Sequence, residues 1–332
     1  MSNVVCFDLE GPLSPQDNAY ELMGLIDEGY SIFEVLSRYD DILTLEGRAG
    51  YEPGDTLSLI VPFLIQHNIS EENILDVSKK AKITGGAREL VQQLSGDWSE
   101  YVISTSYMQH ALNISRQVGI PEDNVYATEF PLDEFYDKVD QKDLNLVEDI
   151  EESILNELSG ESDAEIKETL DEFYSKISET SLGVLSEVKV VGGERKLDFL
   201  NDVIRRECKR LSEVVVVGDS ITDLKMLDAV KKNNGIAVVF NGNKYALSHG
   251  NIGLACSSIQ PLLIILEAFV EGGTEKVFDV VSNLRDKKEQ YNNFLEPYLS
   301  SLLSLSEEEE RKLIKIHSKA RKYVRGEAGK LG

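Results

Sequence analysis

The chain has 332 residues, of which 42% are hydrophobic, and its formal net charge is −25 at pH 7. This length predicts one large domain with insertions, or two to three small domains, with enough apolar residues for a sizeable core. The acidic balance argues against non-specific nucleic-acid binding, which needs clustered Lys and Arg, and it favours metal cations for holding any anionic ligand. No apolar run approaches the roughly 18 residues that a membrane span needs. With three scattered cysteines and no signal-like N-terminus, we expect a cytoplasmic protein.

The first element is a short apolar run over residues 4–7, typical of a parallel strand covered on both faces, and Gly11 and Pro12 end it. Asp8 follows at the point where the backbone turns, and a carboxylate there can attack phosphorus if a cation neutralises the approaching phosphate. Glu10 points to the same side two residues on. It is placed to protonate a leaving oxygen and then to deprotonate water. On their own, the two acids could equally cap a turn.

Residues 14–80 read as an inserted helical module. Apolar residues recur at helical spacing over 16–46, and further helical stretches cover 57–67 and 71–80. The alternating pattern resumes with a helix over 87–94 and a second strand over 101–103, which ends at Ser104, Thr105 and Ser106. The Ser104 hydroxyl and the next backbone N–H groups could grip a phosphate oxygen, with Thr105 as a further contact, although strand-end serines more often form turns. A helix over 108–118, closed by Gly119, and a third strand over 124–128 follow.

Residues 132–188 are crowded with acidic side chains, yet apolar residues still recur at helical spacing. We interpret the segment as two amphipathic helices with acidic outer faces, separated near Gly160, and disorder is the alternative. Such acidic helices could dock a protein partner. The apolar positions are Leu146, Ile150, Ile154 and Leu158 in the first helix, and Ile166, Leu170, Phe173 and Ile177 in the second.

The α/β pattern returns after Gly192 and Gly193, and strands that alternate with helices predict a doubly wound parallel sheet. Ligands of such sheets bind beyond the carboxyl ends of the strands. The basic residues of the tail, including Arg321 and Arg325, are expected to offset the acidic bulk or to contact water rather than nucleic acid. The expected elements are helices over 195–206, 222–232, 261–270 and 274–330, strands over 214–217 and 236–240, and a short edge strand over 255–257.

The most specific signal follows the strand over 214–217, where residues 218–223 read Gly-Asp-Ser-Ile-Thr-Asp. Gly218 permits a tight turn close to a ligand. Asp219 can bind a metal directly, and Asp223, at the start of a helix, can hold a metal-bound water or the loop. Because the available ligands are hard oxygens, Mg²⁺ is the metal expected.

Two further expectations complete the site. The acidic ends of the first strand and of this later strand are expected to meet around one cation between Asp8 and Asp219, with Asp223 beside them. A lysine is needed to neutralise a phosphate and the attacking carboxylate, and Lys196 is the candidate, with Arg195 as its rival.

These pieces, in this order, resemble the haloacid dehalogenase (HAD) superfamily of phosphohydrolases, in the branch that contains phosphoserine phosphatase. The family pattern is a strand followed by Asp-x-Asp-Gly, a strand-end Ser or Thr, a Lys, and a strand followed by Gly-Asp-Ser-x-x-Asp. The resemblance covers about half of the chain and implies a HAD-like Rossmannoid core with a helical cap. It implies Asp8 as nucleophile, the Glu10 carbonyl and Asp219 as Mg²⁺ ligands, and Ser104 and Lys196 as phosphate contacts.

The chain departs from the family pattern in two places. Glu10 replaces the usual second Asp, but both carboxyls have unperturbed pKa values near ~4, so proton transfer is still expected. The acidic module 132–188 has no counterpart in the compact phosphatases. The expected division is a core of 1–13, 81–131 and 189–265, a cap of 14–80, an acidic insertion of 132–188 and a C-terminal helical extension of 266–332. Substrate choice is expected in the cap, where Asp17, Arg38 and Arg48 are candidates for reading a small polar substrate.

The leading hypothesis is a Mg²⁺-dependent phosphomonoester hydrolase that acts on a small phosphorylated metabolite through an aspartyl-phosphate. One alternative is phosphotransfer from the same intermediate to an alcohol acceptor. Another is a non-catalytic accessory subunit, because the whole layout is similar to an archaeal group named for subunit R of energy-converting hydrogenase A. The sequence itself contains no cysteine cluster and no Gly-x-Gly-x-x-Gly motif for redox chemistry.

Overall fold

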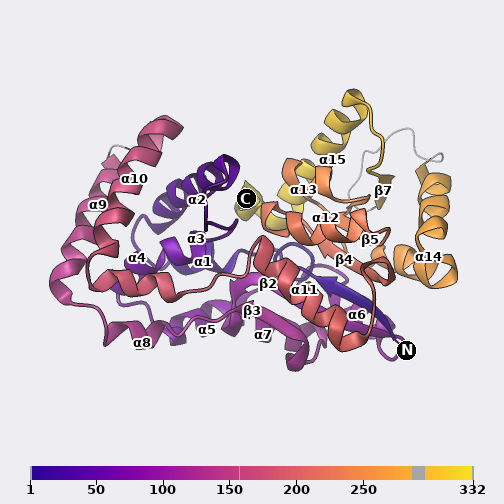
Figure 1. Cartoon of the computed structure of the whole chain (residues 1–332), viewed down its shortest axis with the longest axis horizontal. Coiled ribbons are helices and arrows are strands. Elements are labelled where there is room, and N and C mark those ends of the chain that lie inside the picture. The colour runs from indigo at the N-terminus through magenta and orange to yellow at the C-terminus, as the bar shows by residue number, and fades with distance from the viewer. Residues whose placement is uncertain (1, 157, 286–295, 331–332) are drawn as a thin grey trace.

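The computed structural model describes residues 2–156, 158–285 and 296–330, and its centre is a seven-stranded sheet in the order β3-β2-β1-β4-β5-β6-β7. All neighbouring strands pair in parallel except β6 and β7, which are antiparallel. The predicted α/β class with a largely parallel sheet is therefore confirmed (Figure 1). The strands are β1 (Asn3–Phe7), β2 (Trp98–Tyr107), β3 (Val125–Thr128), β4 (Val214–Gly218), β5 (Ile236–Phe240), β6 (Ile252–Ala255) and β7 (Tyr298–Ser301).

Helices cover both faces of the sheet, which is why its central strands are apolar at every position. In β1, Val5 and Phe7 join one hydrophobic cluster while Val4 and Cys6 join the cluster on the opposite face. The first cluster also contains apolar residues of α6 (Ala87–Leu94), α7 (Met108–Val118) and α14 (Leu262–Arg285), and the second contains those of α11 (Glu194–Glu207), α12 (Leu224–Lys232), α13 (Lys244–His249) and α15 (Glu307–Arg325).

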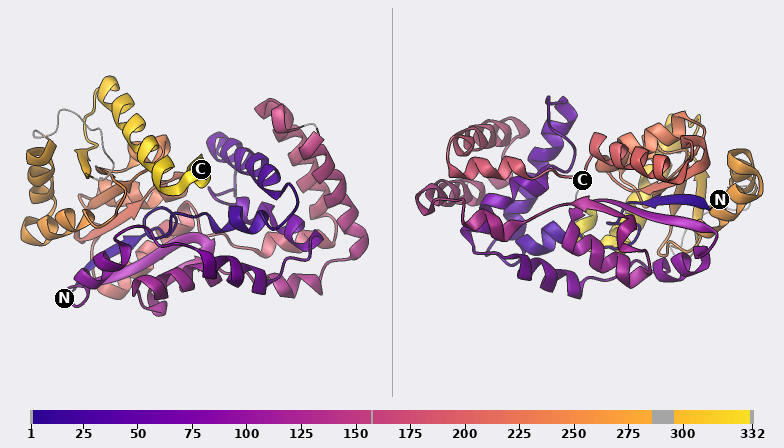
Figure 2. Two further views of the ribbon diagram at one scale, coloured as in Figure 1. Left: turned by 180° about the vertical axis from the view of Figure 1, so that it is seen from behind. Right: turned by 60° about the horizontal axis from the view of Figure 1, so that its bottom comes forward.

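A second lobe, here called the cap lobe, combines residues 14–80 with residues 132–188 (Figures 1 and 2). Its helices share one hydrophobic core, to which Phe63 and Phe173 contribute aromatic rings 6.1 Å apart. The two segments, distant in sequence, therefore fold as one body. Its helices are α1 (Asn18–Met23), α2 (Gly29–Glu46), α3 (Thr56–Leu59), α4 (Val61–Gln66), α5 (Glu71–Lys80), α8 (Leu132–Tyr136), α9 (Asn145–Asn156) and α10 (Asp163–Ser178).

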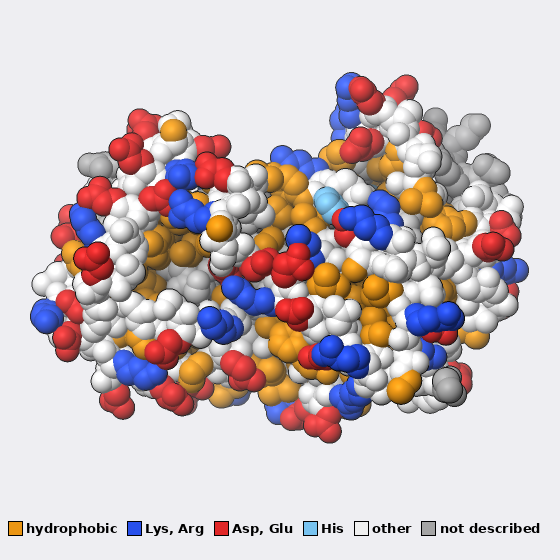
Figure 3. All heavy atoms as spheres, viewed as in Figure 1, with side chains coloured by type: hydrophobic (Ala, Val, Ile, Leu, Met, Phe, Trp, Pro, Cys, Tyr) orange, Lys and Arg blue, Asp and Glu red, His pale blue; other side chains and the backbone are white. Residues whose placement is uncertain are grey.

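The two amphipathic helices predicted within 132–188 are α9 and α10, separated by a short 3-10 turn that ends at Gly160. Their buried apolar residues face the cap core, and acidic side chains gather on the outer surface over these helices (Figure 3). A capping box, in which Ser162 and Glu165 each accept the other's backbone N–H, starts α10. The apolar face of each helix is therefore buried in the cap core.

The elements differ from the sequence expectations at three places. The stretch 16–46 is broken between Met23 and Gly29, where Glu28 takes a left-handed backbone conformation. The strand expected over 255–257 is β6, which ends at Ala255 and is not an edge strand, because β7 pairs with it. β7 lies inside the stretch 274–330, which is predicted to be helical. The prediction was wrong here because the apolar run of β7 continues into leucines whose spacing fits a helix equally well. Residues 286–295 and 331–332 of this extension lie outside the described residues.

Among the described residues, no helix combines the length and apolar character needed to cross a membrane.

A buried histidine ties the cap lobe to the core. His110, on α7, is fully buried, and its Nδ1 lies 2.9 Å from Ser78 Oγ on α5. Asn113, also on α7, donates to the same hydroxyl at 2.9 Å, so Ser78 joins α5 to two residues of α7. Burial lowers the pKa of His110 to about 3.

This histidine predicts an acid-sensitive stability. The unfolded chain takes up the His110 proton below about pH 6.5 and the folded chain only near pH 3, so stability is complete above 6.5 and falls as the pH falls. From pH 7 to 5 this residue should remove about 2 kcal/mol of unfolding free energy. Urea titrations of His110→Asn should show a correspondingly smaller loss, whereas His249→Asn, at a partly exposed ring, should lose as much as the wild type.

Candidate active site

Two aspartates meet where neighbouring strands β1 and β4 end. Asp8 directly follows β1, and its backbone N–H donates to Val217 O at 2.8 Å, which fixes the end of β1 against β4. Asp219 directly follows Gly218, the last residue of β4. Asp8, Asp219 and Asp223 are all buried, and each offers a carboxylate oxygen such that the three lie within 4.8 Å of one another. The ends of β1 and β4 therefore meet as predicted and bring three aspartates within reach of one cation, but Glu10 is not part of this group.

Two glycines make this approach of backbone and carboxylates possible. Gly11 has a φ of +102°, and a Cβ at this position would collide with the Asp219 carboxylate. A Cβ at Gly218 would lie 2.6 Å from the Asp223 carboxyl carbon, closer than real contacts allow. Any side chain at either position would push one of the acids out of the cluster.

Lys196 is the cation at the centre of the cluster. It lies in the first turn of α11, is fully buried, and places Nζ 2.7 Å from Asp8 Oδ1 and 2.7 Å from Asp223 Oδ1. Burial disfavours its charge, but the carboxylates of Asp223 and Asp8 outweigh burial and raise the pKa of Lys196. Its rival Arg195 instead donates to Asp55 of the cap lobe at 2.7 Å. The structure therefore brings Lys196, and not Arg195, to Asp8.

The third aspartate holds the loop. Asp223 Oδ2 accepts the backbone N–H groups of Asp219 at 2.9 Å and of Ser220 at 3.1 Å, while Oδ1 accepts from Lys196. Both of its oxygens thus have protein partners, whereas Oδ1 of Asp219 is buried without one. An orphaned carboxylate oxygen beside Asp8 fits a hard divalent cation. A cation held there would have Asp8 and Asp219 as its nearest carboxylates, while Asp223 positions the loop.

Ser104 lies opposite these acids, but within β2 rather than after it, since β2 continues to Tyr107 with an irregular register against β3. Its buried hydroxyl accepts the backbone N–H of Ser106 at 3.1 Å. The hydroxyls of Thr105 and Ser106 are buried without a hydrogen-bond partner and line the same pocket as Asp8. Each of these hydroxyls can donate a hydrogen bond, and phosphate oxygens accept such bonds.

Glu10 lies at the cap side of the pocket. Its Oε1 accepts the backbone N–H of Asn18 at 3.1 Å, and burial together with the nearby charge of Asp17 raises the pKa of Glu10 to about 8. Burial and the charge of Asp223 raise the pKa of Asp8 to about 7. Asp17 caps α1 by accepting the N–H of Tyr20 at 2.9 Å. A carboxyl that keeps its proton at neutral pH can serve as a general acid.

The cavity that joins these groups has a volume of about 80 Å³. Strand-end loops form its floor, the cap lobe covers it, and α15 adds one wall. Of the candidates for substrate contact, Asp17 and Thr105 line this cavity. Arg38 and Arg48 do not, because they form ion pairs with Asp163 and Asp171 of α10 and so hold the two segments of the cap lobe together.

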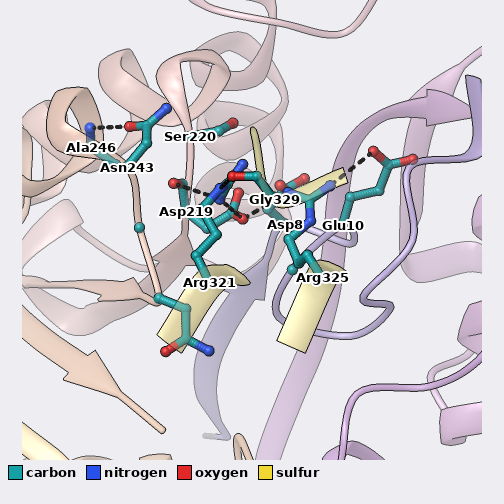
Figure 4. A network of polar contacts seen from close by, with 12 residues as sticks. Asp8, Glu10, Asp219, Ser220, Asn243, Ala246, Arg321, Arg325 and Gly329 are labelled. Atoms are coloured by element: carbon teal, nitrogen blue, oxygen red, sulfur yellow. Dashed lines mark hydrogen bonds and ion pairs between the residues drawn. The ribbon is translucent and has the colours of Figure 1, made fainter. Parts of the chain in front are cut away.

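Two residues of the cavity were not anticipated as part of the site. Arg321 and Arg325 extend from α15 to Asp219, and Figure 4 shows both guanidinium groups directed at its carboxylate. Arg325 Nη1 lies 2.9 Å from Asp219 Oδ2, and its Nη2 lies 3.9 Å from Glu10 Oε2. Their spacing of four residues puts them on one helical face. Because α15 also carries several exposed lysines, the sequence does not show that these two arginines, unlike the lysines, are buried in the site.

By its likeness to solved structures, the largely parallel α/β sheet with a buried acidic triad at its carboxyl edge is a HAD-like fold. The structure of gene product AF1437 from Archaeoglobus fulgidus is similar over 100% of this chain and 99% of that chain, with a TM-score of 0.85 and 28% identity. A substrate-bound phosphoserine phosphatase complex matches 80% of this chain and 98% of its own, with a TM-score of 0.51 and 16% identity. A phospho-aspartyl intermediate analogue of phosphoserine phosphatase matches 79% and 98%, with the same score and identity. No protein-family model and no curated protein matches the sequence.

Proposed function

We propose that the protein is a Mg²⁺-dependent phosphomonoester hydrolase that acts on a small phosphorylated metabolite through an aspartyl-phosphate on Asp8. The observation that carries the proposal is the convergence of Asp8, Asp219 and Lys196 in one buried cluster at the ends of β1 and β4. The fold likeness to phosphoserine phosphatases supports the same class of chemistry. The hydroxyls of Thr105 and Ser106 line the same pocket and have no hydrogen-bond partner, which supports phosphate as the group held there.

In this proposal the Asp8 carboxylate attacks phosphorus while the bond from phosphorus to the leaving oxygen breaks, and Glu10 gives its proton to that oxygen. Lys196 fixes the attacking carboxylate and offsets its charge. Glu10, now ionised, takes a proton from water; the water oxygen attacks phosphorus, the bond to Asp8 breaks, and phosphate leaves. Bound Mg²⁺ supplies positive charge that offsets the repulsion between phosphate and Asp8.

The test is a panel of phosphate esters incubated with the purified protein and Mg²⁺, with phosphate release as the measurement. Turnover that requires Mg²⁺ on at least one ester is expected. A panel with no turnover would contradict the proposal. Glycerol or homoserine added to an active reaction separates phosphotransfer to an alcohol from hydrolysis, since phosphotransfer lowers the phosphate yield and forms a phosphorylated acceptor.

The docking role predicted for residues 132–188 stays a prediction, to be tested by pull-down with a variant that lacks them.

The role of Glu10 predicts an effect that depends on the leaving group. Glu10→Gln keeps the size of the side chain but cannot donate a proton, so hydrolysis of an alkyl phosphate should fall by about 10²–10⁴-fold. A nitrophenyl phosphate, whose leaving oxygen departs without protonation, should lose much less in the step that forms the aspartyl-phosphate. Burst kinetics of the nitrophenolate isolate this step. Equal losses on both esters would exclude Glu10 as the acid.

A further inference from the structure

One face of α15 is fitted to the active-site loop. His317, Arg321 and Arg325 follow one another at intervals of four residues and are all buried. His317 Nδ1 accepts the backbone N–H of Gly242 at 3.2 Å, and Arg321 Nη1 donates to the backbone oxygen of Asp219 at 3.2 Å. Arg325 Nε donates to Pro15 O at 3.2 Å, which also ties the helix to the start of the cap lobe. The helix is therefore a specific part of the site and not a loose tail.

The two guanidinium groups converge on a single oxygen. Both pair with Oδ2 of Asp219, while Oδ1 of the same carboxylate has no hydrogen-bond partner. Three buried carboxylates, those of Asp8, Asp219 and Asp223, gather here with Lys196. The arginines of α15 therefore neutralise charge that a divalent cation would otherwise neutralise. A cation at Oδ1 and the guanidinium groups at Oδ2 must also repel each other across one carboxylate.

The same helix limits the size of the cavity. Arg321 and Arg325 form part of its wall, and its volume is about 80 Å³. Because one water needs roughly 10–15 Å³ on this scale, the space inside the cavity is suited to a phosphate group rather than to a whole metabolite. With α15 docked, two of its arginines occupy space beside Asp219 at the wall of this cavity.

We propose that α15 is a metal-sensitive clasp over the active site, with Arg321 and Arg325 setting the affinity of the site for its divalent cation. Without the cation, the arginines neutralise Asp219 and hold the helix closed. Cation binding weakens their hold, loosens α15 and opens the cavity to substrate. The inference rests on the proposed function, because it assigns the metal to the same site. Coupling of this kind is reciprocal, so weakening the clasp must strengthen metal binding.

The test measures Mg²⁺ binding to the full chain by isothermal titration calorimetry. The double variant Arg321→Gln/Arg325→Gln removes two positively charged side chains from the site. The control, Lys319→Gln/Lys322→Gln, removes the same amount of charge from the exposed face of the same helix. The arginine variant should bind Mg²⁺ about tenfold more tightly or better, while the lysine variant stays within about twofold of the wild type. Equal or weaker binding by the arginine variant would overturn the clasp.

A measurement on the wild type alone removes any dependence on how the variants fold. Amide hydrogen exchange over α15 should become faster when Mg²⁺ is added, while exchange in β1 and β4 does not. Unchanged or slower exchange over α15 at saturating Mg²⁺ would overturn the inference. Tighter Mg²⁺ binding in a protein that hydrolyses no ester would support the clasp and contradict the phosphatase. Ester hydrolysis together with equal Mg²⁺ affinity in every variant would support the phosphatase and contradict the clasp.

Discussion

An Asp8→Asn variant should lose Mg²⁺-dependent phosphate-ester hydrolysis by more than ~10⁴-fold, as expected when the group that forms the covalent intermediate is removed. The amide is nearly the same size as the carboxylate, so packing against β4 is kept. It cannot donate a lone pair to phosphorus as readily, and it no longer offers Lys196 a charged partner. The measurement is the initial rate of phosphate release on the best ester of the panel.

Two observations make the loss specific to chemistry. Far-UV circular dichroism and the urea midpoint should show that Asp8→Asn remains folded, so that lost activity is not lost structure. Mass spectrometry of an acid-quenched reaction should find a phosphoryl group on the wild-type peptide that contains Asp8 and none on the variant. Residual activity above about one per cent of the wild type would exclude Asp8 as the nucleophile.

The sequence predicted the sheet and the cluster well because both depend on local patterns. Four valines followed by Gly-Asp, and an apolar run followed by Asp8, each specify a buried strand with an acid at its end. Parallel pairing then places the acids side by side. The two runs do not themselves specify that β1 and β4 are neighbours; that expectation comes from the order of motifs, which resembles the HAD phosphohydrolases.

The contributions of α15 and of the cap lobe depend on contacts between distant segments, which periodicity does not encode. Arg38 and Arg325 are both arginines on helices, yet one pairs with Asp163 of α10 and the other reaches Asp219. Likewise, nothing in residues 132–188 specifies that their apolar face completes the core of residues 14–80. The acidic composition of this segment does not indicate that, among the residues the structure describes, it supplies 14 of the 36 buried residues of the cap core.

Lys196 makes the largest expected contribution to stability. Lys196→Met should lower the free energy of unfolding at pH 7 by about 3–5 kcal/mol, because it leaves Asp8 and Asp223 buried next to each other without their shared cation. The matched control is Lys225→Met, which removes an exposed lysine paired with Glu194 at 2.7 Å and should cost at most about 1 kcal/mol. Urea denaturation measures both.

Two further measurements test whether uncompensated charge causes the loss of stability in Lys196→Met. Lys196→Met/Asp223→Asn should be more stable than the sum of the two single variants predicts, since the double variant no longer buries two like charges without a cation. Saturating Mg²⁺ should stabilise Lys196→Met more than the wild type, because the cation neutralises the same carboxylates. If Lys196→Met cost no more than Lys225→Met, the buried lysine would not be what holds the acidic cluster together, and the electrostatic account of the site would be wrong.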